Sequence, residues 1–370
     1  MSDSKSKHEN KRILFVTHRL QWEGAPVSLF FMAKGFKNAG YEVDVVSPSE
    51  GPVRDLYEKE GMNCTIFNFM SDDELPESLK SYDLYFVNTI IGYKFINHLD
   101  LERDKVAWII RESEREVHFK NNPDIDPALF GKVTKVLFVA NSTKDMYIDL
   151  ANDNFVTINN GMDLAEVDAH IEKTDKKEMR AKLGFAEDDK IIHIVGTVSP
   201  RKGQLDFTEA AVNIINKLGD TRLKFVIIGA GNVPLYDDQI RRVIERNKME
   251  DQIMLLDSRG SWDYYSISNM YVCTSYIESF PRVTLEAMAF KLPIVSSEVY
   301  GLSEQMDHEK EALIYMAGDK VMLEDHMTRL IQNEELASTL ASNARARLER
   351  EFTFDVMMDK YFNLVSEILN

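Results

Sequence analysis

The stretch Arg-Ile-Leu-Phe-Val-Thr, residues 12–17, opens the pattern that decides the fold. It is rich in β-branched and aromatic residues, which predicts a buried strand. A helix-length stretch follows over residues 26–39, Gly40 ends it, and residues 42–46, Glu-Val-Asp-Val-Val, predict the next strand. Strand, helix and strand in this order form a βαβ unit, so the segment indicates an α/β fold with parallel strands.

The same alternation continues and then restarts in the middle of the chain. Residues 173–182 are highly charged, and residues 191–195, Ile-Ile-His-Ile-Val, begin a second series of buried-type strands. We therefore expect a domain boundary between residues 163 and 190, which separates two α/β halves of similar size. The remaining strands are expected at residues 64–69, 84–87, 106–110, 136–139, 155–158, 225–228, 253–256, 270–274 and 293–296.

Composition excludes several classes of protein. The chain has 370 residues, a net charge of −17 and two cysteines. It has no overall excess of positive charge for nonspecific nucleic-acid binding, and two distant thiols do not make a disulfide framework. No apolar run reaches the roughly 20 residues that a membrane helix needs. Residues 1–12 are polar and lack an apolar signal core, so we expect a short flexible arm there.

The strongest chemical signal is the stretch from Tyr276 to Ala289, Tyr-Ile-Glu-Ser-Phe-Pro-Arg-Val-Thr-Leu-Glu-Ala-Met-Ala. It places Glu278 in a loop after an expected strand and Glu286 about one turn inside the following helix. Free backbone N–H groups before a helix favour anions, and carboxylates on either side accept hydrogen bonds from hydroxyl groups. The alternative is a loop followed by a solvated helix face, and spacing alone does not decide between the two.

Glu278 and Glu286 at this spacing, with the segments that follow, resemble the signature of the family 4 glycosyltransferases. The matching segments are Ala-Met-Ala at 287–289, Lys-Leu-Pro-Ile-Val-Ser-Ser at 291–297, Asn-Gly-Met-Asp at 160–163, the loop from Gly196 to Gly203, and Gly-Leu-Ser-Glu at 301–304. The resemblance is densest over residues 155–315. It implies a GT-B fold, in which two Rossmann-like domains carry parallel sheets that face an interdomain cleft.

The resemblance also implies how the chain is organised. An N-terminal domain over residues 1–165 binds the acceptor, and a C-terminal domain over residues 166–353 binds a nucleotide-sugar. The amphipathic segment 354–370 forms a final helix that packs back onto the first domain. The implied reaction is sugar transfer with retention at the anomeric carbon, and UDP is the default nucleotide.

Roles in the C-terminal half carry over from the family. Arg201 and Lys202 are expected to neutralise the donor diphosphate, where two cations stabilise the charge that grows on the leaving group. Glu278 is expected near the hydroxyls of the donor sugar, and these three residues form the catalytic set. The alternative for the basic pair is a solvated turn. The donor-binding set is Gly24, Thr197, Gly229, Gly231, Ser279, Phe280, Pro281, Arg282 and Glu286, the last of which accepts from the ribose hydroxyls.

The sequence departs from the family pattern near the donor. Thr197 stands where the family has an arginine after Gly196, so Arg201 is expected to take that role. Pro281 stands where the family has a glycine, and proline has no N–H to give to a ligand. The guanidinium of Arg282 is expected to compensate for the lost donor.

The acceptor or sugar side is expected at strand ends of the N-terminal half. Gly24 stands alone where the family often has two glycines, and His18 follows the first strand. Arg111 follows the strand at 106–110, where many family members have a histidine or an aspartate. Glu112 and His118 are alternatives for that role. Each of these residues also fits a plain strand end or a solvated helix start.

No cofactor and no metal are expected. Asp124-Ile125-Asp126 has the form of a metal-binding triplet, but the prolines on both sides predict a surface turn. Gly-Ala-Gly at 229–231 lacks the third glycine of a dinucleotide fingerprint, which favours a tight turn over NAD binding. The nucleotide-sugar is a substrate, and nucleic acid is not an expected partner.

The sequence therefore predicts a retaining, hexosyl-transferring enzyme of α/β GT-B fold. It moves a sugar to a glycan, a lipid-linked acceptor or another hydroxyl, in the synthesis of surface polysaccharide or glycoconjugate. We expect a cytoplasmic protein with peripheral contact at the inner face of the membrane. Two alternatives stay open: a nucleotide-sugar epimerase of the same fold, and a non-catalytic partner subunit.

Overall fold

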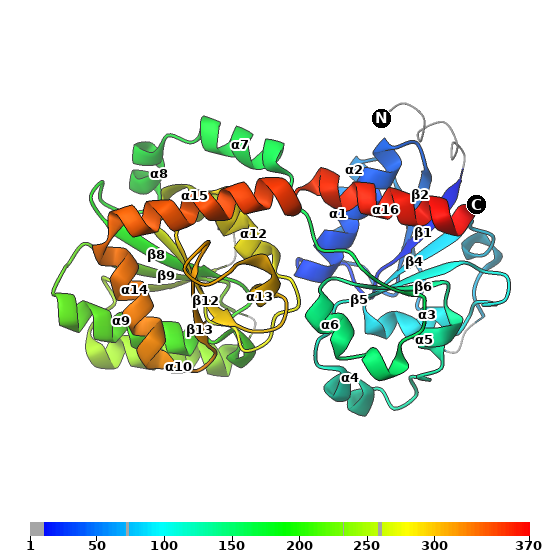
Figure 1. Cartoon of the computed structure of the whole chain (residues 1–370), viewed down its shortest axis with the longest axis horizontal. Helices are drawn as coiled ribbons and strands as arrows, with labels where there is room; N and C mark the ends of the chain where they lie inside the picture. Colours follow the sequence, from blue (N-terminus) through cyan, green and yellow to red (C-terminus); the bar gives the residue numbers. More distant parts are fainter. Residues whose placement is uncertain (1–10, 72–73, 232, 258–260) are drawn as a thin grey trace. The chain divides into compact units, whose positions relative to one another are not determined.

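The computed structural model describes residues 11–71, 74–231, 233–257 and 261–370, and residues 1–10 of the expected N-terminal arm lie outside this description. The chain divides into two compact units (Figure 1). The first comprises the residues up to Asn160 together with Asp355–Asn370, and the second is Gly161–Phe354. The corresponding divisions expected from the sequence lie at residues 165 and 353.

The first unit is built on a seven-stranded sheet in the order β3-β2-β1-β4-β5-β6-β7. All neighbouring strands are parallel, so their carboxyl ends lie along one edge. The order turns back between β1 and β4, and ligands of open α/β sheets bind at such a point. The strands are β1 Arg12–Val16, β2 Glu42–Ser47, β3 Asn63–Ile66, β4 Leu84–Asn88, β5 Val106–Ile110, β6 Lys135–Phe138 and β7 Phe155–Thr157.

Both faces of this sheet are buried. On one face, Phe36 contacts Phe86 of β4, with ring centroids 5.4 Å apart, and Tyr361 of the C-terminal helix contacts Phe86 at 5.9 Å. On the other face, Leu14 and Trp108 belong to a second apolar cluster. The helices of this unit are α1 Gly24–Asn38, α2 Arg54–Lys59, α3 Tyr93–Ile96, α4 Arg115–Asn121, α5 Leu129–Lys132, α6 Asn141–Asp145, α16 Phe354–Leu369, and the 3-10 turns η1 Glu77–Leu79, η2 Ile90–Gly92 and η3 Ile148–Leu150.

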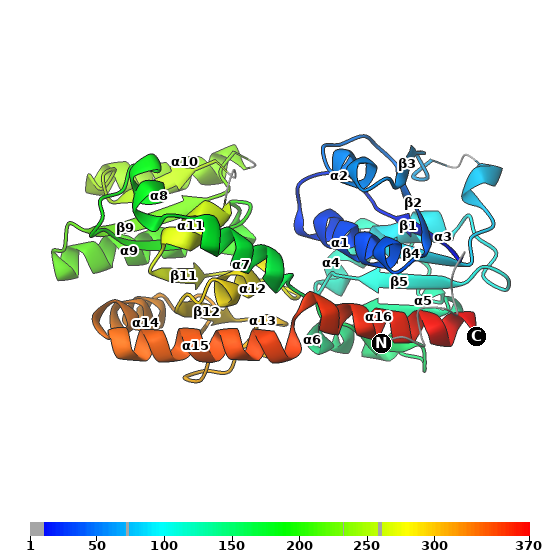
Figure 2. The ribbon, with the colours of Figure 1, turned by 90° about the horizontal axis from the view of Figure 1, so that it is seen from above.

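The last helix, α16, completes the first unit from the far end of the chain (Figure 2). Its bounds, Phe354–Leu369, agree to within one residue with the expected helix at 354–370. Lys105 Nζ donates to the carbonyl of Ile368 at 2.6 Å, and Lys135 pairs with Glu367 at 2.7 Å. Both lysines lie where β5 and β6 begin, and a cation is favourable at a helix C-terminus.

The second unit has a six-stranded parallel sheet in the order β10-β9-β8-β11-β12-β13. Ile192 and Ile194 of β8 pack with Phe207 of α9 on one face, and Ile191 packs with Ile267 on the other. The strands are β8 Lys190–Val195, β9 Leu223–Ile228, β10 Ile253–Leu256, β11 Met270–Cys273, β12 Ile294–Glu298 and β13 Leu313–Met316. The helices are α7 Leu164–Lys173, α8 Lys176–Lys182, α9 Gln204–Leu218, α10 Pro234–Asn247, α11 Ser261–Ile267, α12 Arg282–Ala289, α13 Leu302–Gln305, α14 Lys320–Gln332, α15 Glu334–Glu351 and the 3-10 turn η4 Pro200–Lys202.

The α/β expectation is confirmed, with local corrections. Within the charged residues 173–182, for which no element is expected, Lys176–Lys182 form a helix that Asp175 caps by accepting from the N–H groups of Lys177 and Glu178. The sequence analysis also missed β13, a short strand next to β12. Helix α1 begins at Gly24 and not at Pro26, so Gly24 lies in the helix start. Within the described residues, no helix is long and apolar enough to cross a bilayer.

Candidate functional site

Two glycines bring β8 and β9 together at their carboxyl ends. Gly196 follows β8 with a φ of +144°, and Gly229 follows β9 with a φ of +127°. A Cβ atom on Gly229 would lie 2.1 Å from the carbonyl oxygen of Gly196, so a side chain does not fit there. The two turns therefore pack backbone against backbone at the edge of the sheet where ligands of such folds bind.

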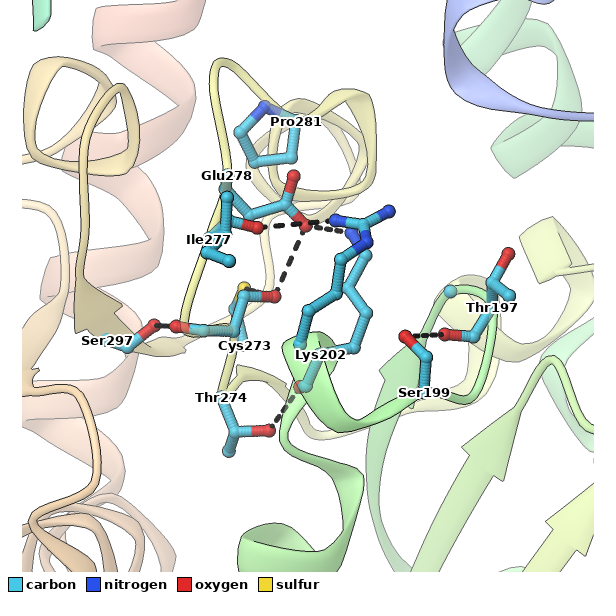
Figure 3. Close-up of polar contacts among 12 residues, drawn as sticks. Thr197, Ser199, Lys202, Cys273, Thr274, Ile277, Glu278, Pro281 and Ser297 are labelled. Carbon is cyan, nitrogen blue, oxygen red and sulfur yellow. Dashed lines mark hydrogen bonds and ion pairs between the residues drawn. The ribbon is translucent and has the colours of Figure 1, made fainter. Parts of the chain in front are cut away.

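The loop after β8 is fastened to the loop after β11. The turn Pro200–Lys202 leads into Gly203, whose φ is +67° and where a Cβ atom would lie 2.2 Å from the carbonyl oxygen of Thr274. The Thr274 hydroxyl donates to the carbonyl of Lys202 at 2.9 Å (Figure 3). The backbone in front of α9 is thereby held against the loop that follows β11.

The side chains of Lys202 and Glu278 form an ion pair across these two loops (Figure 3). Only 12% of the lysine side chain and 9% of the glutamate side chain are exposed. The Ser275 hydroxyl donates to the same carboxylate at 3.2 Å, and the Ser297 hydroxyl donates to the Ser275 carbonyl at 2.6 Å. The sequence analysis assigned both charges to a ligand, and the structure shows that they also contact each other.

The environment of Lys202 lowers the pKa of its amine. Burial and the neighbouring Arg201 lower the pKa of Lys202 to about 8. The carboxylate of Glu278 opposes this shift, because an opposite charge favours the protonated amine. Lys202 is therefore a cation at neutral pH, in a place where an added anion stabilises its charge further.

Arg201 lies at the surface beside this pair. Its guanidinium donates to the carbonyl of Ile277 at 3.3 Å, and its own carbonyl accepts from the N–H of Tyr276 at 2.8 Å. Both contacts run along the loop that carries Glu278. The two cations that the sequence singled out therefore lie together at the carboxyl ends of β8 and β11.

The start of α12 is fixed by packing. Helix α12 begins at Arg282 after Pro281, whose carbonyl accepts from the side-chain amide of Gln305 at 3.0 Å. Phe280 is buried and its ring contacts that of Phe352 with centroids 5.3 Å apart. Ser279 lies between this anchor and Glu278, so the short loop carrying the carboxylate is held at both ends.

Glu286 lies on α12 in a partly buried position. Burial raises the pKa of its carboxyl group, and Arg282, Trp262 and Tyr265 oppose that shift. Tyr265 is fixed in turn, since its hydroxyl donates to the carbonyl of Val283 at 2.8 Å. Arg282 is one helical turn before Glu286, which puts the two charges on one face. These surroundings contradict the alternative of a solvated helix face.

Gln204 orders the loop after β8, and the sequence analysis missed it. Its Nε2 donates to the carbonyl of Thr197 at 3.2 Å, and its Oε1 accepts from the N–H of Ser199 at 3.2 Å. An amide side chain directly after Gly203, at the start of an expected helix, is the signal in the sequence. Gly231 is held differently, because its N–H donates to the carboxylate of Asp237 at 2.6 Å.

In the first unit, Arg111 is held by two side-chain amides. Its Nε donates to Oδ1 of Asn88 at 2.7 Å, and its Nη1 donates to Oδ1 of Asn160 at 3.1 Å. Asn88 ends β4 and is fully buried, and Asn160 follows β7. The sequence analysis did not select Asn88, although a buried polar residue at the end of an apolar strand is a signal for a site.

Glu112 joins two backbone segments. Its Oε2 accepts from the N–H of Ile90 at 3.0 Å and from the N–H of Arg111 at 2.8 Å. Burial raises the pKa of this carboxyl group, and these N–H groups and His118 oppose the shift. Glu112 therefore links the turn after β4 to the end of β5, and His118 on α4 lies close enough to act on its charge.

His18 follows β1 and is neutral at physiological pH. Arg19 Nε donates to Nε2 of His18 at 3.0 Å. Burial, Arg19 and Arg111 lower the pKa of His18 to about 4. Its Nδ1 atom is buried, and no described residue pairs with it. Gly24, six residues later, is exposed at the start of α1.

The triplet Asp124-Ile125-Asp126 forms a turn that other residues tie down. The hydroxyl of Tyr93 donates to Asp124 at 2.6 Å, and Lys94 pairs with the same carboxylate. Asp126 accepts from the N–H of Ala128 at 2.9 Å. Across the described part of the chain, no group of three or more histidine, cysteine or acidic residues is arranged to hold a metal ion.

Comparison with known proteins identifies the family. Residues 175–347 match the family model for glycosyl transferases group 1, and residues 9–173 match that for glycosyl-transferase family 4. The chain is 23% identical over 198 residues to N-acetyl-alpha-D-glucosaminyl L-malate synthase of Bacillus anthracis, a match that covers 53% of this chain and 50% of that protein. It is 24% identical over 321 residues to D-inositol 3-phosphate glycosyltransferase of Corynebacterium aurimucosum, covering 75% of this chain and 76% of that one.

The fold is also that of a solved structure, Alr3699/HepE of Anabaena. The TM-score is 0.85 at 19% sequence identity, and the match covers 97% of this chain and 100% of that one. Two parallel-sheet α/β units with this likeness are the GT-B fold. Together with the two family models, which between them span most of the sequence, they show that the chain belongs to the family 4 glycosyltransferases.

Proposed function

We propose that this glycosyltransferase moves a hexosyl group from a UDP-sugar to a hydroxyl acceptor, with retention at the anomeric carbon. The observation that carries the proposal is the Lys202–Glu278 ion pair, with Arg201 beside it, at the carboxyl ends of β8 and β11. The structure of Alr3699/HepE was solved in complex with UDP and glucose, which supports a UDP-sugar donor. The names of two relatives include L-malate and D-inositol 3-phosphate, which supports a hydroxyl-bearing acceptor.

In this proposal the two cations stabilise the negative charge of the leaving group. Arg201 and Lys202 bind the donor diphosphate, and Glu278 accepts hydrogen bonds from hydroxyls of the sugar. Because Lys202 and Glu278 contact each other, the donor enters between or beside them and gives each a new partner. Glu286, held by Arg282 and Tyr265, accepts from the ribose hydroxyls, and the start of α12 lies against the donor through residues 279–282.

The proposed step needs no nucleophile from the protein. The bond from the anomeric carbon to the diphosphate oxygen breaks, and the bond to the acceptor oxygen forms on the same face of the sugar. The acceptor proton passes to the departing diphosphate. The protein positions the two substrates and stabilises the charge that develops on the diphosphate, contributions that belong to orientation and electrostatics.

The side chains of Arg201 and Lys202 supply positive charge to this site, so we propose that no metal ion is needed. Activity is then unchanged by a chelator.

We also propose that the protein acts in the cytoplasm at the inner face of a membrane, in the synthesis of a surface polysaccharide or glycoconjugate. A non-catalytic partner subunit remains the rival reading, since Thr197 and Arg111 replace residue types that the family uses near the donor.

The test measures thermal stability against UDP, GDP, ADP and their sugars, because a ligand that binds only the folded state raises the Tm. UDP is expected to raise it, and Lys202→Ala and Glu286→Ala are expected to abolish that rise. Lys217→Ala is the matched control, since Lys217 lies at the other end of α9 and 56% of its side chain is exposed. A wild-type protein that responds to no nucleotide at millimolar concentration contradicts the proposal.

Turnover assays distinguish a transferase from an epimerase and from a non-catalytic subunit. A transferase releases free sugar slowly from its donor in the absence of acceptor, and an epimerase forms a new nucleotide-sugar. A non-catalytic subunit does neither, although it can still bind the nucleotide. Anomeric configuration of the released product, followed by NMR, tests retention.

A further inference from the structure

The second unit contains a cavity of about 400 Å³ at the amino ends of β11 and β12, where Asn269 and Pro293 line it. The Lys202–Glu278 pair lies at the carboxyl ends, so the cavity is separate from the proposed donor site. Cavities of this size bind small molecules. We propose that this one binds a small amphipathic anion, an apolar ring with a carboxylate or a phosphate, and that its occupancy regulates donor binding. The regulatory part rests on the proposed function.

Part of the cavity wall is apolar. Tyr265 of α11 and Phe290, which follows α12, both line the cavity. Their rings stack with centroids 5.4 Å apart and planes 22° apart. Ile171, Leu292 and Pro293 add aliphatic surface beside them. Aromatic rings pack well against such surfaces, and burial of apolar area favours binding. The wall therefore favours a ligand with an apolar ring.

The charged groups of the cavity favour an anion. Lys176, Lys291 and Arg345 line it, and Asp168 is the one carboxylate among the described lining residues. Both oxygens of Asp168 accept from Arg345, at 3.0 and 2.9 Å, and Asp175 next to Lys176 caps α8. The two lysines are exposed, and no described residue forms an ion pair with either amine. In a chain with a net charge of −17, two such lysines at one cavity indicate an anionic ligand.

Ser268 supplies a hydrogen-bond donor to the same cavity. Its Oγ atom is buried, and no described residue pairs with it. A buried hydroxyl without a partner costs free energy, and an oxygen of a bound carboxylate or phosphate accepts from it. The hydroxyls of Ser266 and Thr174, which also line the cavity, already donate to the carbonyls of Trp262 and His170. Among the described serines and threonines of the wall, Ser268 is therefore the one left for a ligand.

The apolar wall is shared with the residues that hold Glu286. The hydroxyl of Tyr265 donates to the carbonyl of Val283 at 2.8 Å, one turn before Glu286, and Tyr265 acts on the Glu286 carboxylate. The N–H of Phe290 donates to the carbonyl of Glu286 at 2.9 Å. A ligand packed against these two rings contacts the groups on which the orientation of Glu286 depends. Binding at two sites that share packed side chains is coupled, with equal effect in both directions.

The binding test titrates 1-naphthoate, and separately 1-naphthyl phosphate, into the full chain without nucleotide. Isothermal titration is expected to show one site for at least one of the two anions, which distinguishes a carboxylate ligand from a phosphate ligand. The neutral 1-naphthamide has the same ring and is expected to bind about tenfold more weakly, because it lacks the charge. Wild-type protein that binds neither anion overturns the inference, and so does equal binding of the amide.

Charge reversal locates the site. Lys176→Glu and Lys291→Glu are each expected to weaken binding of the anion about tenfold, and both replace exposed residues, so the variants are expected to fold. Lys360→Glu is the matched control, since Lys360 is an exposed lysine of α16 in the first unit, and it is expected to change nothing. Unchanged affinity in both cavity variants overturns the inference.

Ser268→Ala tests the unpartnered hydroxyl. It is expected to weaken binding of the anion about threefold without lowering the Tm of the ligand-free protein, because the hydroxyl lost has no partner among the described residues. A fall in Tm with unchanged anion affinity contradicts the role given to Ser268.

UDP separates the cavity from the donor site and tests regulation. A probe bound at Arg201 and Lys202 is displaced completely as UDP is added, whereas the affinity of a probe in the cavity changes only to a plateau. The plateau is expected at about fivefold, and saturating probe changes the affinity for UDP by the same factor. Tyr265→Phe keeps the ring and removes the hydroxyl, so it is expected to retain probe binding and to reduce the factor.

These outcomes distinguish the two proposals. Complete displacement of the probe by UDP overturns the cavity as its site, and an unchanged affinity for UDP with saturating probe overturns the regulatory part. Wild-type protein that binds no UDP contradicts the proposed function, and the titrations without nucleotide still test the cavity by themselves.

Discussion

Lys202 in the second unit and Arg111 in the first hold equivalent places, since each lies at the carboxyl edge of a parallel sheet. Their partners differ. Lys202 contacts a carboxylate, and both side chains are nearly buried, whereas Arg111 donates to two neutral amides. A ligand of Lys202 must replace or share the charge partner already present. In Arg111, the two amides fix the plane of the guanidinium.

The largest expected effect comes from breaking the pair in the second unit. Lys202→Ala leaves Glu278 as a buried carboxylate without its partner, which costs about 3–5 kcal/mol of unfolding free energy. It also removes charge stabilisation of the leaving group, which lowers kcat by roughly 100- to 1,000-fold. Denaturant unfolding and UDP release measure the two effects.

The double variant Lys202→Met/Glu278→Leu separates the two roles. Apolar side chains of similar volume need no partner, so most of the stability returns. Activity stays low because the cation is still absent. A double variant that recovers activity as well would show that the pair serves only the fold.

The next effect comes from the backbone that carries the pair. Gly203→Ala puts a Cβ atom 2.2 Å from the Thr274 carbonyl oxygen, at a φ of +67°. The conformation alone costs about 1–3 kcal/mol, and the clash adds to it. Gly219→Ala is the matched control, because its φ is +63° and no atom lies within 4 Å of the added Cβ. Thermal unfolding should show a clearly larger loss at Gly203, and equal losses would contradict the close packing of the two loops.

A smaller effect is expected in the first unit. Arg111→Gln removes hydrogen bonds to two neutral amides, each worth about 0.5–1.5 kcal/mol. The loss of unfolding free energy is therefore about 1–2 kcal/mol, well below that of Lys202→Ala. Urea unfolding measures the loss in both variants. Equal losses of unfolding free energy in Lys202→Ala and Arg111→Gln would contradict the difference between the partners of the two cations.

The last effect is a dependence on pH, which sets in only above neutral pH. The pKa of Lys202 is about 8 in the folded chain and the ordinary lysine value is 10.5, so the unfolded chain holds the proton more strongly. Stability of the ligand-free protein therefore gains from this group as pH rises from 8 to 10.5. UDP binding takes up that proton above pH 8, so UDP affinity falls by up to about tenfold per pH unit.

Measurements of the UDP-induced rise in Tm from pH 7 to 9.5 test this dependence. Lys202→Arg keeps its charge over the whole range and is expected to flatten the profile. A wild-type profile that is already flat would show that Glu278 holds the lysine proton as firmly as a ligand does.

The sequence predicted the alternation of elements well because the signal is local. Apolar spacing predicts the last helix to within one residue of its bounds, Phe354–Leu369, and the distance from Glu278 predicts that Glu286 lies in the following helix, α12. The short strand β13 and the helix at Lys176–Lys182 are not predicted, since four residues give little periodicity and a seven-residue charged helix has no apolar stripe to reveal it.

Side-chain partners were harder to predict because they depend on contacts between distant segments. The pairing of Lys202 with Glu278 spans 76 residues, and Asn160 reaches Arg111 across 49. Nothing in the local pattern shows that a cation is matched by a carboxylate in one unit and by amides in the other. Residue types at strand ends therefore predict where the candidate sites lie. The charge partners within each site depend on the fold and are not predicted.

The return of α16 to the first unit also sets the order in which this protein can mature. Residues up to Asn160 leave the ribosome first, yet Phe36 and Phe86 receive Tyr361 only when the end of the chain has been made. At 5–20 residues per second, the interval is on the order of ten to forty seconds. During that time Phe36 and Phe86 lack the ring of Tyr361 that contacts them in the folded unit.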